Sequence, residues 1–332
     1  MPKTTAPAQY VLILIGMVEE QGHDREKLLA GTTLAETGIS GIGARVSESD
    51  FAQLVDNALT LTTNPSLGLD LGMRLNLGAH AVLGQAFMTC KDLRQVMDLF
   101  LKYYHLLSPA LYLEFETVGD RCILTTVSTP EQNSVHFAYE LMYAAILNTL
   151  RGLLNRDDLN IALEVPYAAP GHAQRYHQIF GDDVSFNCFR GRISFDRALL
   201  DATLPSSNTA LRSLYEEECA RLLADLEEAD SIAEQTLRLL RKLEGQYPQM
   251  PRIAQMLNFS SRTYRRRLEQ ESESYQSLLD KVRAEHATRY LQNTRLPLST
   301  IAYMIGFNDS SNFRRAYFKW TGRSPRDVRH GS

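Results

Sequence analysis

The chain has 332 residues, of which 44% are hydrophobic and 22% charged, with 12 Pro and 19 Gly. This composition is typical of a globular protein and excludes disordered, collagen-like and disulfide-framework classes, while the length predicts two domains. The net charge of −4 by itself argues against a nucleic-acid partner, but it hides an asymmetry. Residues 231–332 contain 18 Lys and Arg against 9 Asp and Glu, a net charge of +9, whereas residues 1–230 carry −13. The basic part is therefore the candidate for binding a polyanion.

The sequence gives little indication of a targeting segment, a membrane span or a metal site. The longest apolar run, residues 10–18, is about half of what a membrane span needs, and it predicts a buried first helix rather than a signal peptide. His172 and His177 are five residues apart without an accompanying carboxylate cluster, so we expect no metal and no cofactor. We expect a cytoplasmic protein with no membrane partner. The four cysteines are widely spaced without a CxxC pair, which indicates ordinary thiols: Cys90, Cys122, Cys188 and Cys219.

The first two thirds of the chain predict a mixed α/β domain ending near Pro205. Glycines interleaved with leucines over residues 67–84 suggest tight turns between short helices, and Thr89 is a candidate cap for the helix that follows. Gly119-Asp120 predicts a hairpin. The expected helices cover residues 10–30, 50–62, 91–107 and 132–154, and the expected strands cover residues 111–115, 122–128, 161–165, 183–186 and 192–195.

An acidic amphipathic helix follows over residues 211–226, and from Ser231 onward the pattern is helical only. This order predicts an α+β protein, in which a mixed α/β N-terminal domain precedes an all-α domain. The predicted divisions are an N-terminal domain over residues 1–205, a linker helix over 206–230 that packs either at the domain junction or in a homodimer contact, and a C-terminal domain over 231–332.

The basic segment contains an internal repeat. Residues 252–260 match residues 300–308 at an offset of 48, with Ile, Ala, Met and Phe at equivalent positions. After a slip of one residue, residues 264–268 match residues 313–317. Each copy predicts a short helix, a turn containing Asn258 or Gly306, and a second helix, which is the helix-turn-helix plan. We therefore expect two such motifs.

The second helix of each copy has an apolar and a polar side. In the later copy Phe313, Ala316, Tyr317 and Trp320 form the inner side; in the earlier copy Tyr264, Arg267 and Leu268 do so. An exposed face with Arg, Ser, Thr and Asn suits the major groove of DNA. A solvated surface helix is the alternative, but the duplication and the local charge make it less favoured. The DNA-contact candidates are Ser261, Arg262, Thr263, Arg265, Arg266, Ser310, Ser311, Asn312, Arg314, Arg315 and Lys319.

A helix over residues 275–293 joins the two motifs. A helix of this length spans about 30 Å, close to the roughly 34 Å between successive major-groove segments on one face of DNA. A single chain is therefore expected to contact two half-sites of double-stranded DNA.

Residues 298–325, ending in Gly322-Arg323-Ser324-Pro325, resemble the C-terminal signature of the AraC/XylS family of bacterial transcription regulators. Residues 260–268 resemble the first recognition helix of that family. Residues 67–84 and 103–107 are similar to its branch with an arabinose-binding-like effector domain, which includes ornithine-utilisation-type regulators. The resemblance implies an activator or repressor in which a small-molecule effector on the N-terminal domain alters DNA binding or contact with RNA polymerase.

The first recognition helix carries more Arg than the resemblance leads one to expect, which favours phosphate contacts. We expect base contacts from Arg262, Thr263, Ser311 and Asn312, and phosphate contacts from residues such as Arg266 and Arg315. For the effector, aromatic and histidine side chains are candidates to line a largely apolar pocket, although for each one taken singly packing in the core or at an interface is the favoured explanation. Arg74, Lys102 and Arg151 are candidate cations for an anionic effector. The candidate pocket residues are His80, Tyr103, Tyr104, His105, His136, Tyr139 and Tyr143.

Two other classes of function compete with a regulator. An enzyme is disfavoured because no phosphate-binding loop, nucleophile elbow or HExxH motif is present. An architectural or adaptor protein that binds DNA without an effector would lack both sequence preference and a ligand.

Overall fold

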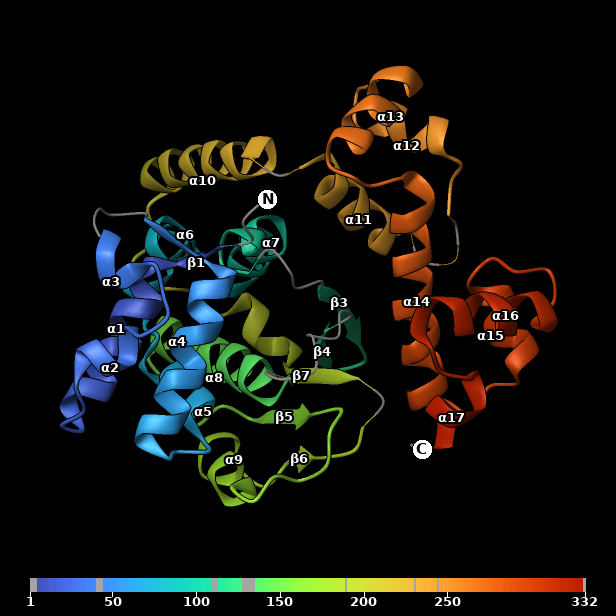
Figure 1. The fold of residues 1–332 in the computed structure, drawn as a ribbon. Helices are drawn as coiled ribbons and strands as arrows, with labels where there is room; N and C mark the ends of the chain where they lie inside the picture. Colours follow the sequence, from blue (N-terminus) through green and yellow to red (C-terminus); the bar gives the residue numbers. More distant parts are fainter. Residues whose placement is uncertain are drawn as a thin grey trace. The chain divides into compact units, whose positions relative to one another are not determined.

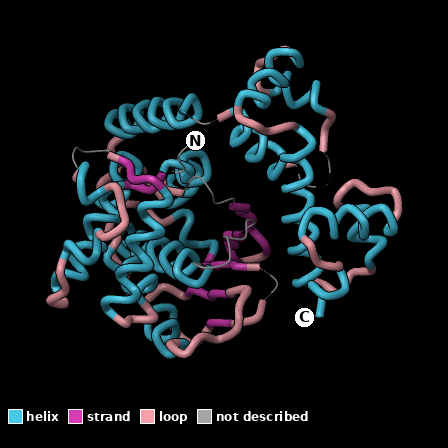
Figure 2. Tube along the Cα trace, viewed as in Figure 1, coloured by secondary structure: helices cyan, strands magenta, loops and turns pink. Residues whose placement is uncertain are grey.

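The chain divides into two compact units, one of residues 3–225 and the other containing residues 226–332. The computed structural model describes residues 5–39, 44–108, 113–126, 135–188, 190–229, 231–243, 245 and 247–330. Among these residues, strands occur only in the first unit, and the second is built from helices and loops (Figure 2). The fold class is therefore α+β, as the sequence predicts.

The first unit contains a five-stranded sheet with helices packed against it (Figure 1). A two-stranded antiparallel ribbon pairs β1 (Thr5–Pro7) with β2 (Arg45–Ser47). The other strands are β3 (Leu113–Val118), β4 (Arg121–Thr126), β5 (Ile161–Glu164), β6 (Val184–Ser185) and β7 (Gly191–Asp196). The helices are α1 (Ala8–Glu20), α2 (Arg25–Leu29), α3 (Leu34–Thr37), α4 (Glu48–Thr62), α5 (Leu67–Arg74), α6 (Ala81–Met88), α7 (Leu93–Tyr103), α8 (Val135–Leu154), α9 (Ala173–Phe180) and α10 (Thr209–Ala229), with 3-10 turns at Leu77–His80, Tyr104–Leu106 and Arg197–Asp201.

The large sheet has the strand order β3-β4-β7-β5-β6 and is antiparallel except for the β5–β6 pair, which α9 connects. Its apolar residues alternate along the strands, so that one face is buried, as in Cys122, Ile193 and Phe195. Helix α8 lies on the buried side, where the Tyr143 hydroxyl is 2.6 Å from Thr126 Oγ1. The expected hairpin is confirmed, with Gly119 at φ +55°. Residues 111, 112, 127 and 128 of the expected strands lie outside the described residues.

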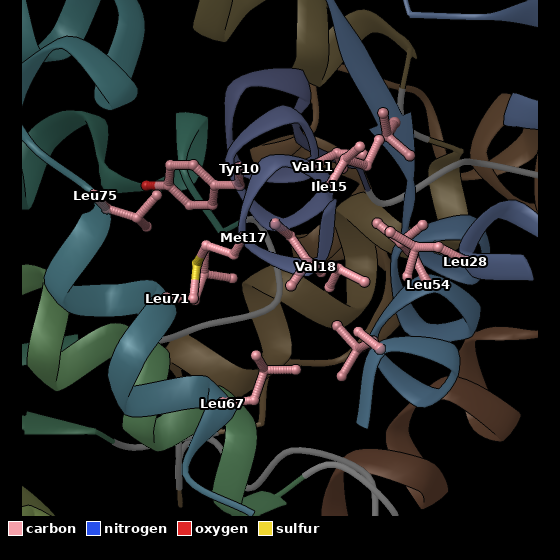
Figure 3. Close-up of a cluster of buried hydrophobic side chains, with 14 of the residues drawn as sticks. Tyr10, Val11, Ile15, Met17, Val18, Leu28, Leu54, Leu67, Leu71 and Leu75 are labelled. Carbon is pink, nitrogen blue, oxygen red and sulfur yellow. The ribbon is translucent and has the colours of Figure 1, made fainter. Parts of the chain in front are cut away.

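A helical core forms around α1. Val11, Ile15 and Val18 are at most 2% exposed and pack with Leu54 of α4 and with side chains of α2 and α5 (Figure 3). This burial confirms the first helix expected over the apolar run. The helix is shorter than expected over residues 10–30, because Gly22 at φ +82° breaks it and Asp24 caps α2.

Of the four glycines in residues 67–84, Gly78 lies in a 3-10 turn between the short helices α5 and α6, as the sequence suggests, whereas Gly84 lies inside α6. Gly68 and Gly72 lie inside α5, where that helix packs directly on α8. A Cβ on Gly72 would lie 2.6 Å from Ala144 Cβ and 2.7 Å from the Leu141 carbonyl oxygen. These glycines therefore permit close helix contact rather than unusual backbone angles.

Thr89 is also not the cap of the helix that follows it. The side chain of Asp92 accepts a hydrogen bond from the Gln95 N–H and caps α7, whereas Thr89 donates to the Ala86 carbonyl at the end of α6. Helix α7 accordingly begins two residues later than expected and ends at Tyr103, where a 3-10 turn follows.

The second unit contains two helical cores that share one helix. The first core joins α11, α12, α13 and the start of α14, and the second joins the end of α14 with α15, α16 and α17. The helices are α11 (Ile232–Lys242), α12 (Met250–Met256), α13 (Ser261–Gln270), α14 (Tyr275–Asn293), α15 (Leu298–Met304), α16 (Ser310–Thr321) and α17 (Pro325–His330).

Candidate nucleic-acid interface

The two copies of the repeat fold alike (Figure 1). In the turn of the first, Asn258 has φ +59° and the Phe259 N–H donates to the Ala254 carbonyl at 2.8 Å. In the second, Gly306 has φ +84° and Phe307 makes the equivalent bond, also at 2.8 Å, to Ala302. Each copy is therefore a helix-turn-helix motif, formed by α12 and α13 and by α15 and α16.

Different side chains cap the two recognition helices. Ser260 caps α13 by accepting from the Thr263 N–H. Asp309 caps α16 by accepting from the N–H groups of Ser311 and Asn312 at 2.8 and 2.7 Å. The Asn312 N–H, followed by other local hydrogen bonds, lowers the pKa of Asp309. The second recognition helix thus places a carboxylate at its N-terminus, where the first has a hydroxyl.

The inner and outer faces of both helices follow the predicted phase. Tyr264, Leu268, Phe313 and Tyr317 are at most 1% exposed. Arg267 is the exception, because it is exposed and its guanidinium lies 4.5 Å from the centre of the Phe259 ring. The predicted DNA-contact side chains are exposed at Arg262, Arg265, Arg266, Ser311, Asn312, Arg314, Arg315 and Lys319, and half-buried at Ser261, Thr263 and Ser310.

The arginines of the two helices differ in their hydrogen bonding. Among the described residues, Arg262, Arg265 and Arg266 make no side-chain hydrogen bond or ion pair. On α16, in contrast, the Arg315 guanidinium donates to Asn312 Oδ1 at 2.6 Å, and Arg314 Nε is 3.4 Å from the Ser310 carbonyl oxygen. The first recognition helix therefore presents guanidinium groups ready to pair with phosphate or guanine.

Asn312 is held at both ends of its amide. Its Nδ2 donates to Asp309 Oδ2, while its Oδ1 accepts from Arg315. A bidentate contact with adenine uses the same two atoms. Asn312 must therefore exchange both internal hydrogen bonds in order to read adenine, which sequence reasoning had not revealed.

The candidate effector residues of the first unit fall into separate groups. His80 is buried in the helical core, and its ring nitrogens lie 2.8 Å from the Tyr10 hydroxyl and 3.0 Å from Thr149 Oγ1. Burial lowers the pKa of His80 to about 4, so His80 is a neutral structural side chain. A second group is Tyr103, Tyr104 and His105, all buried at the end of α7, where the rings of Tyr104 and His105 are 4.2 Å apart.

The third group lies on α8 beside the sheet. The Tyr139 and Tyr143 rings are stacked 5.9 Å apart, and both side chains lie next to Gly191 of β7. The His136 ring is 4.2 Å from the Tyr167 ring. The three candidate cations are engaged elsewhere. Arg74 pairs with Glu20, Lys102 pairs with Glu216, and Arg151 donates to the carbonyls of Asp157 and Ile179.

Both units of the chain match known protein families. Residues 22–204 match the arabinose-binding domain of AraC transcription regulators, and residues 253–331 match a helix-turn-helix domain family. The chain belongs to the AraC family of transcription regulators. It is thus a DNA-binding regulator with an N-terminal domain of the effector type, in a family that is not one of enzymes.

Several relatives align along most of this AraC-family chain. It is 35% identical to the ornithine utilization regulator of Pseudomonas aeruginosa, over 97% of this chain and 96% of the relative. It is 26% identical to the regulator VqsM of the same species, over 79% and 83% of the two chains. The solved structure of the regulator CdpR from Pseudomonas aeruginosa aligns over 97% of this chain and 98% of its own, with 20% identity and a TM-score of 0.44.

Sequence reasoning missed a buried polar cluster in the effector-type domain of this AraC-family protein. Glu140 of α8 is 2% exposed, and its Oε1 lies 2.6 Å from His172 Nε2 and accepts from the Tyr176 hydroxyl at 2.7 Å. The Tyr167 hydroxyl is 2.9 Å from that of Tyr176. The available signal was a single glutamate in an otherwise apolar stretch of helix.

Two further observations bear on ligands and location. Within the described ranges, no group of three or more His, Cys, Asp or Glu side chains is arranged to hold a metal ion. None of the helices in the described part of the chain has the length and apolar character needed to cross a membrane.

Proposed function

We propose that this protein is a sequence-specific transcription regulator that binds two successive major-groove segments through α13 and α16, under the control of a small molecule bound by its N-terminal domain. The observation that carries the DNA-binding part is the duplicated motif. Two recognition helices with buried inner faces and exposed Arg, Ser, Thr and Asn side chains belong to one compact unit. Major-groove recognition needs such side chains on the exposed face of a helix.

The charge distribution supports the same proposal. The basic segment of residues 231–332 carries +9 and supplies the electrostatic attraction to phosphate, while the acidic remainder at −13 is repelled by it. In this proposal Arg266 and Arg315 bind phosphate, whereas Arg262, Thr263, Ser311 and Asn312 contact base edges. Residues 231–332 then form the DNA-binding domain and residues 1–205 the effector domain, and the protein acts in the cytoplasm together with RNA polymerase.

The effector is proposed to be a small polar metabolite. A relative that is 35% identical is named for ornithine utilization, so basic amino acids are the first compounds to test. The α8 group of His136, Tyr139 and Tyr143 is the favoured region, because its rings and the adjacent Glu140 cluster combine apolar and polar surface. His80 is omitted from the proposed site because its hydrogen bonds are already made within the core.

Helix α10, which lies within the predicted linker of residues 206–230, is proposed to make a homodimer contact. On α10 the side chains of Leu211 and Leu214 are 42% and 59% exposed. Exposed leucines on one helix suit pairing with a second copy. Replacement of both by Glu should shift the full-length protein toward monomer in sedimentation velocity if the helix pairs in this way.

One experiment tests DNA specificity and effector control together. Bound duplexes are selected from random pools by the full-length protein, with and without ornithine, arginine or lysine. The proposal expects a two-part site bound at least about 10³-fold more tightly than random DNA, with affinity changed by at least one compound. Loss of sequence preference would indicate an architectural DNA-binding protein, and sequence preference without any response would contradict control by these amino acids.

A further inference from the structure

Helix α14 contributes to the hydrophobic cores of both helix-turn-helix motifs. Leu278, Leu279 and Val282 are buried in the first core, while Ala287 and Leu291 are buried in the second. The first core also holds the inner face of α13, and the second holds that of α16. The short stretch of α14 between the two cores therefore lies where the relative placement of the recognition helices is decided.

Arg283 occupies this stretch and contacts both motifs. Its guanidinium carbon lies 5.2 Å from the centre of the Tyr247 ring and 5.3 Å from the centre of the Phe307 ring. Tyr247 packs against the first core, and Phe307, in the turn of the second motif, packs against the second. Both rings are within the range of a cation–π interaction.

The turn of the second motif leaves room for this guanidinium. A Cβ on Gly306 would lie 2.9 Å from Arg283 Nη2. The positive φ of Gly306 favours glycine at this position, and the missing side chain leaves space that the Arg283 guanidinium occupies.

The surroundings of Arg283 fix it further. The Tyr247 hydroxyl is 2.6 Å from His286 Nδ1, and the two rings are stacked 6.1 Å apart, so the Tyr247 ring is held against α14. Arg283 Nε is buried and has no hydrogen-bond partner among the described residues. Burial lowers the pKa of Arg283, and a guanidinium tolerates such a place better than an ammonium because it is planar and weakly hydrated.

We infer that Arg283 is a positioning residue that sets the spacing and rotation between the two recognition helices, and thereby the distance between DNA half-sites that the protein accepts. This inference rests on the proposed two-site binding of DNA. It assigns Arg283 no contact with DNA. Its effect should therefore appear in the response to half-site spacing and not in the affinity for a single half-site.

The test compares Arg283→Lys with wild type in the full chain, on the DNA site selected by the wild-type protein. Lysine keeps the positive charge but lacks the planar group that contacts both rings. The duplexes are the selected site, the same site with one base pair inserted between the half-sites, and sites with either half scrambled. One inserted base pair moves the half-sites by about 3.4 Å and rotates them by about 34°.

For wild type we expect the insertion to lower affinity by about tenfold or more. For Arg283→Lys we expect about tenfold weaker binding to the selected site, because an ammonium group lacks the planar surface with which the guanidinium contacts both rings. The penalty for the insertion should shrink to about twofold, and affinity for single half-sites should remain within about twofold of wild type. Lys281→Ala is the matched control, because it removes a positive charge from an exposed position of the same helix and should keep the full spacing penalty.

Three results would overturn the inference. They are an unchanged spacing penalty in Arg283→Lys, an equal loss on single and paired half-sites, and unfolding of the second motif in both Arg283→Lys and Arg283→Met, measured by circular dichroism and Trp320 fluorescence. If the wild-type protein selects no two-part site, the proposed function fails instead. The two failures are thereby distinguished.

Discussion

The contact between α5 and α8 gives the sharpest test of the fold. Gly72→Ala gains about 1 kcal/mol of helix propensity. It also places a Cβ 2.6 Å from Ala144 Cβ and 2.7 Å from the Leu141 carbonyl oxygen. Because the second contact is with backbone, it cannot be relieved by a rotamer change, and overpacking of this kind costs about 1–3 kcal/mol or more.

Gly16→Ala is the matched control. Gly16 lies inside α1, and a Cβ there would meet no atom within 4 Å outside its own helix. The gain in helix propensity is about 1 kcal/mol in both variants, so their difference isolates the cost of the contact. We expect Gly72→Ala to be about 1–3 kcal/mol less stable than Gly16→Ala.

Urea unfolding of the full-length protein measures this difference. Circular dichroism follows both units, while Trp320, the single tryptophan, reports on the unit containing residues 226–332. Gly72→Ala should lower the urea concentration at the midpoint of the transition seen by circular dichroism. The midpoint of the transition seen by Trp320 fluorescence should not change. Equal stabilities of the two alanine variants would refute the reasoning.

Three further predictions concern DNA binding and pH. Arg262→Ala should weaken binding at one half-site by about 1–3 kcal/mol if its guanidinium pairs bidentately with guanine; an equal loss on scrambled DNA in fluorescence anisotropy would contradict that role. Arg266→Ala should weaken binding to all sequences alike and reduce the slope of log K against log salt by about 1, and an unchanged slope would rule out a phosphate contact. Because burial lowers the pKa of folded His80 to about 4, below the unfolded value of 6.5, protonation favours the unfolded state. The stability that neutral His80 provides is present above pH 6.5 and is lost as pH falls toward 4, by ~3 kcal/mol. Urea unfolding should therefore show that the free energy of unfolding falls more steeply over this pH range in wild type than in His80→Gln. Parallel pH profiles of the two proteins would count against the lowered pKa of His80.

The sequence predicted the recognition helices well because their signals are local. Apolar residues at helical spacing placed Tyr264, Phe313 and Tyr317 in the core, and the structure buries all three. The repeat of Ala254 and Ala302 predicted the second motif from the first. Arg267 was placed wrongly because an arginine beside an aromatic ring can lie on the surface and still pack along it.

The first unit was predicted less well because its decisive contacts join distant residues. Glycine spacing in residues 67–84 carries no information about α8, which lies about 70 positions further along the chain and accounts for Gly68 and Gly72. Likewise, the partners of His80 are Tyr10 and Thr149, and the His172–Glu140–Tyr176 cluster joins two separate helices. Such contacts depend on packing and leave no periodic pattern in the sequence.

The sequence by itself determined that a basic, all-helical DNA-binding segment with two helix-turn-helix motifs follows an acidic mixed α/β region, since charge and helical periodicity are properties of neighbouring residues. Tertiary structure alone decided which polar groups are already engaged. It showed that burial lowers the pKa of His80 within the core, that the Asn312 amide is hydrogen-bonded at both ends, and that Arg283 contacts the rings of both Tyr247 and Phe307. The physical reason is that hydrogen bonds and ring contacts depend on distances of a few ångströms between residues that only folding brings together.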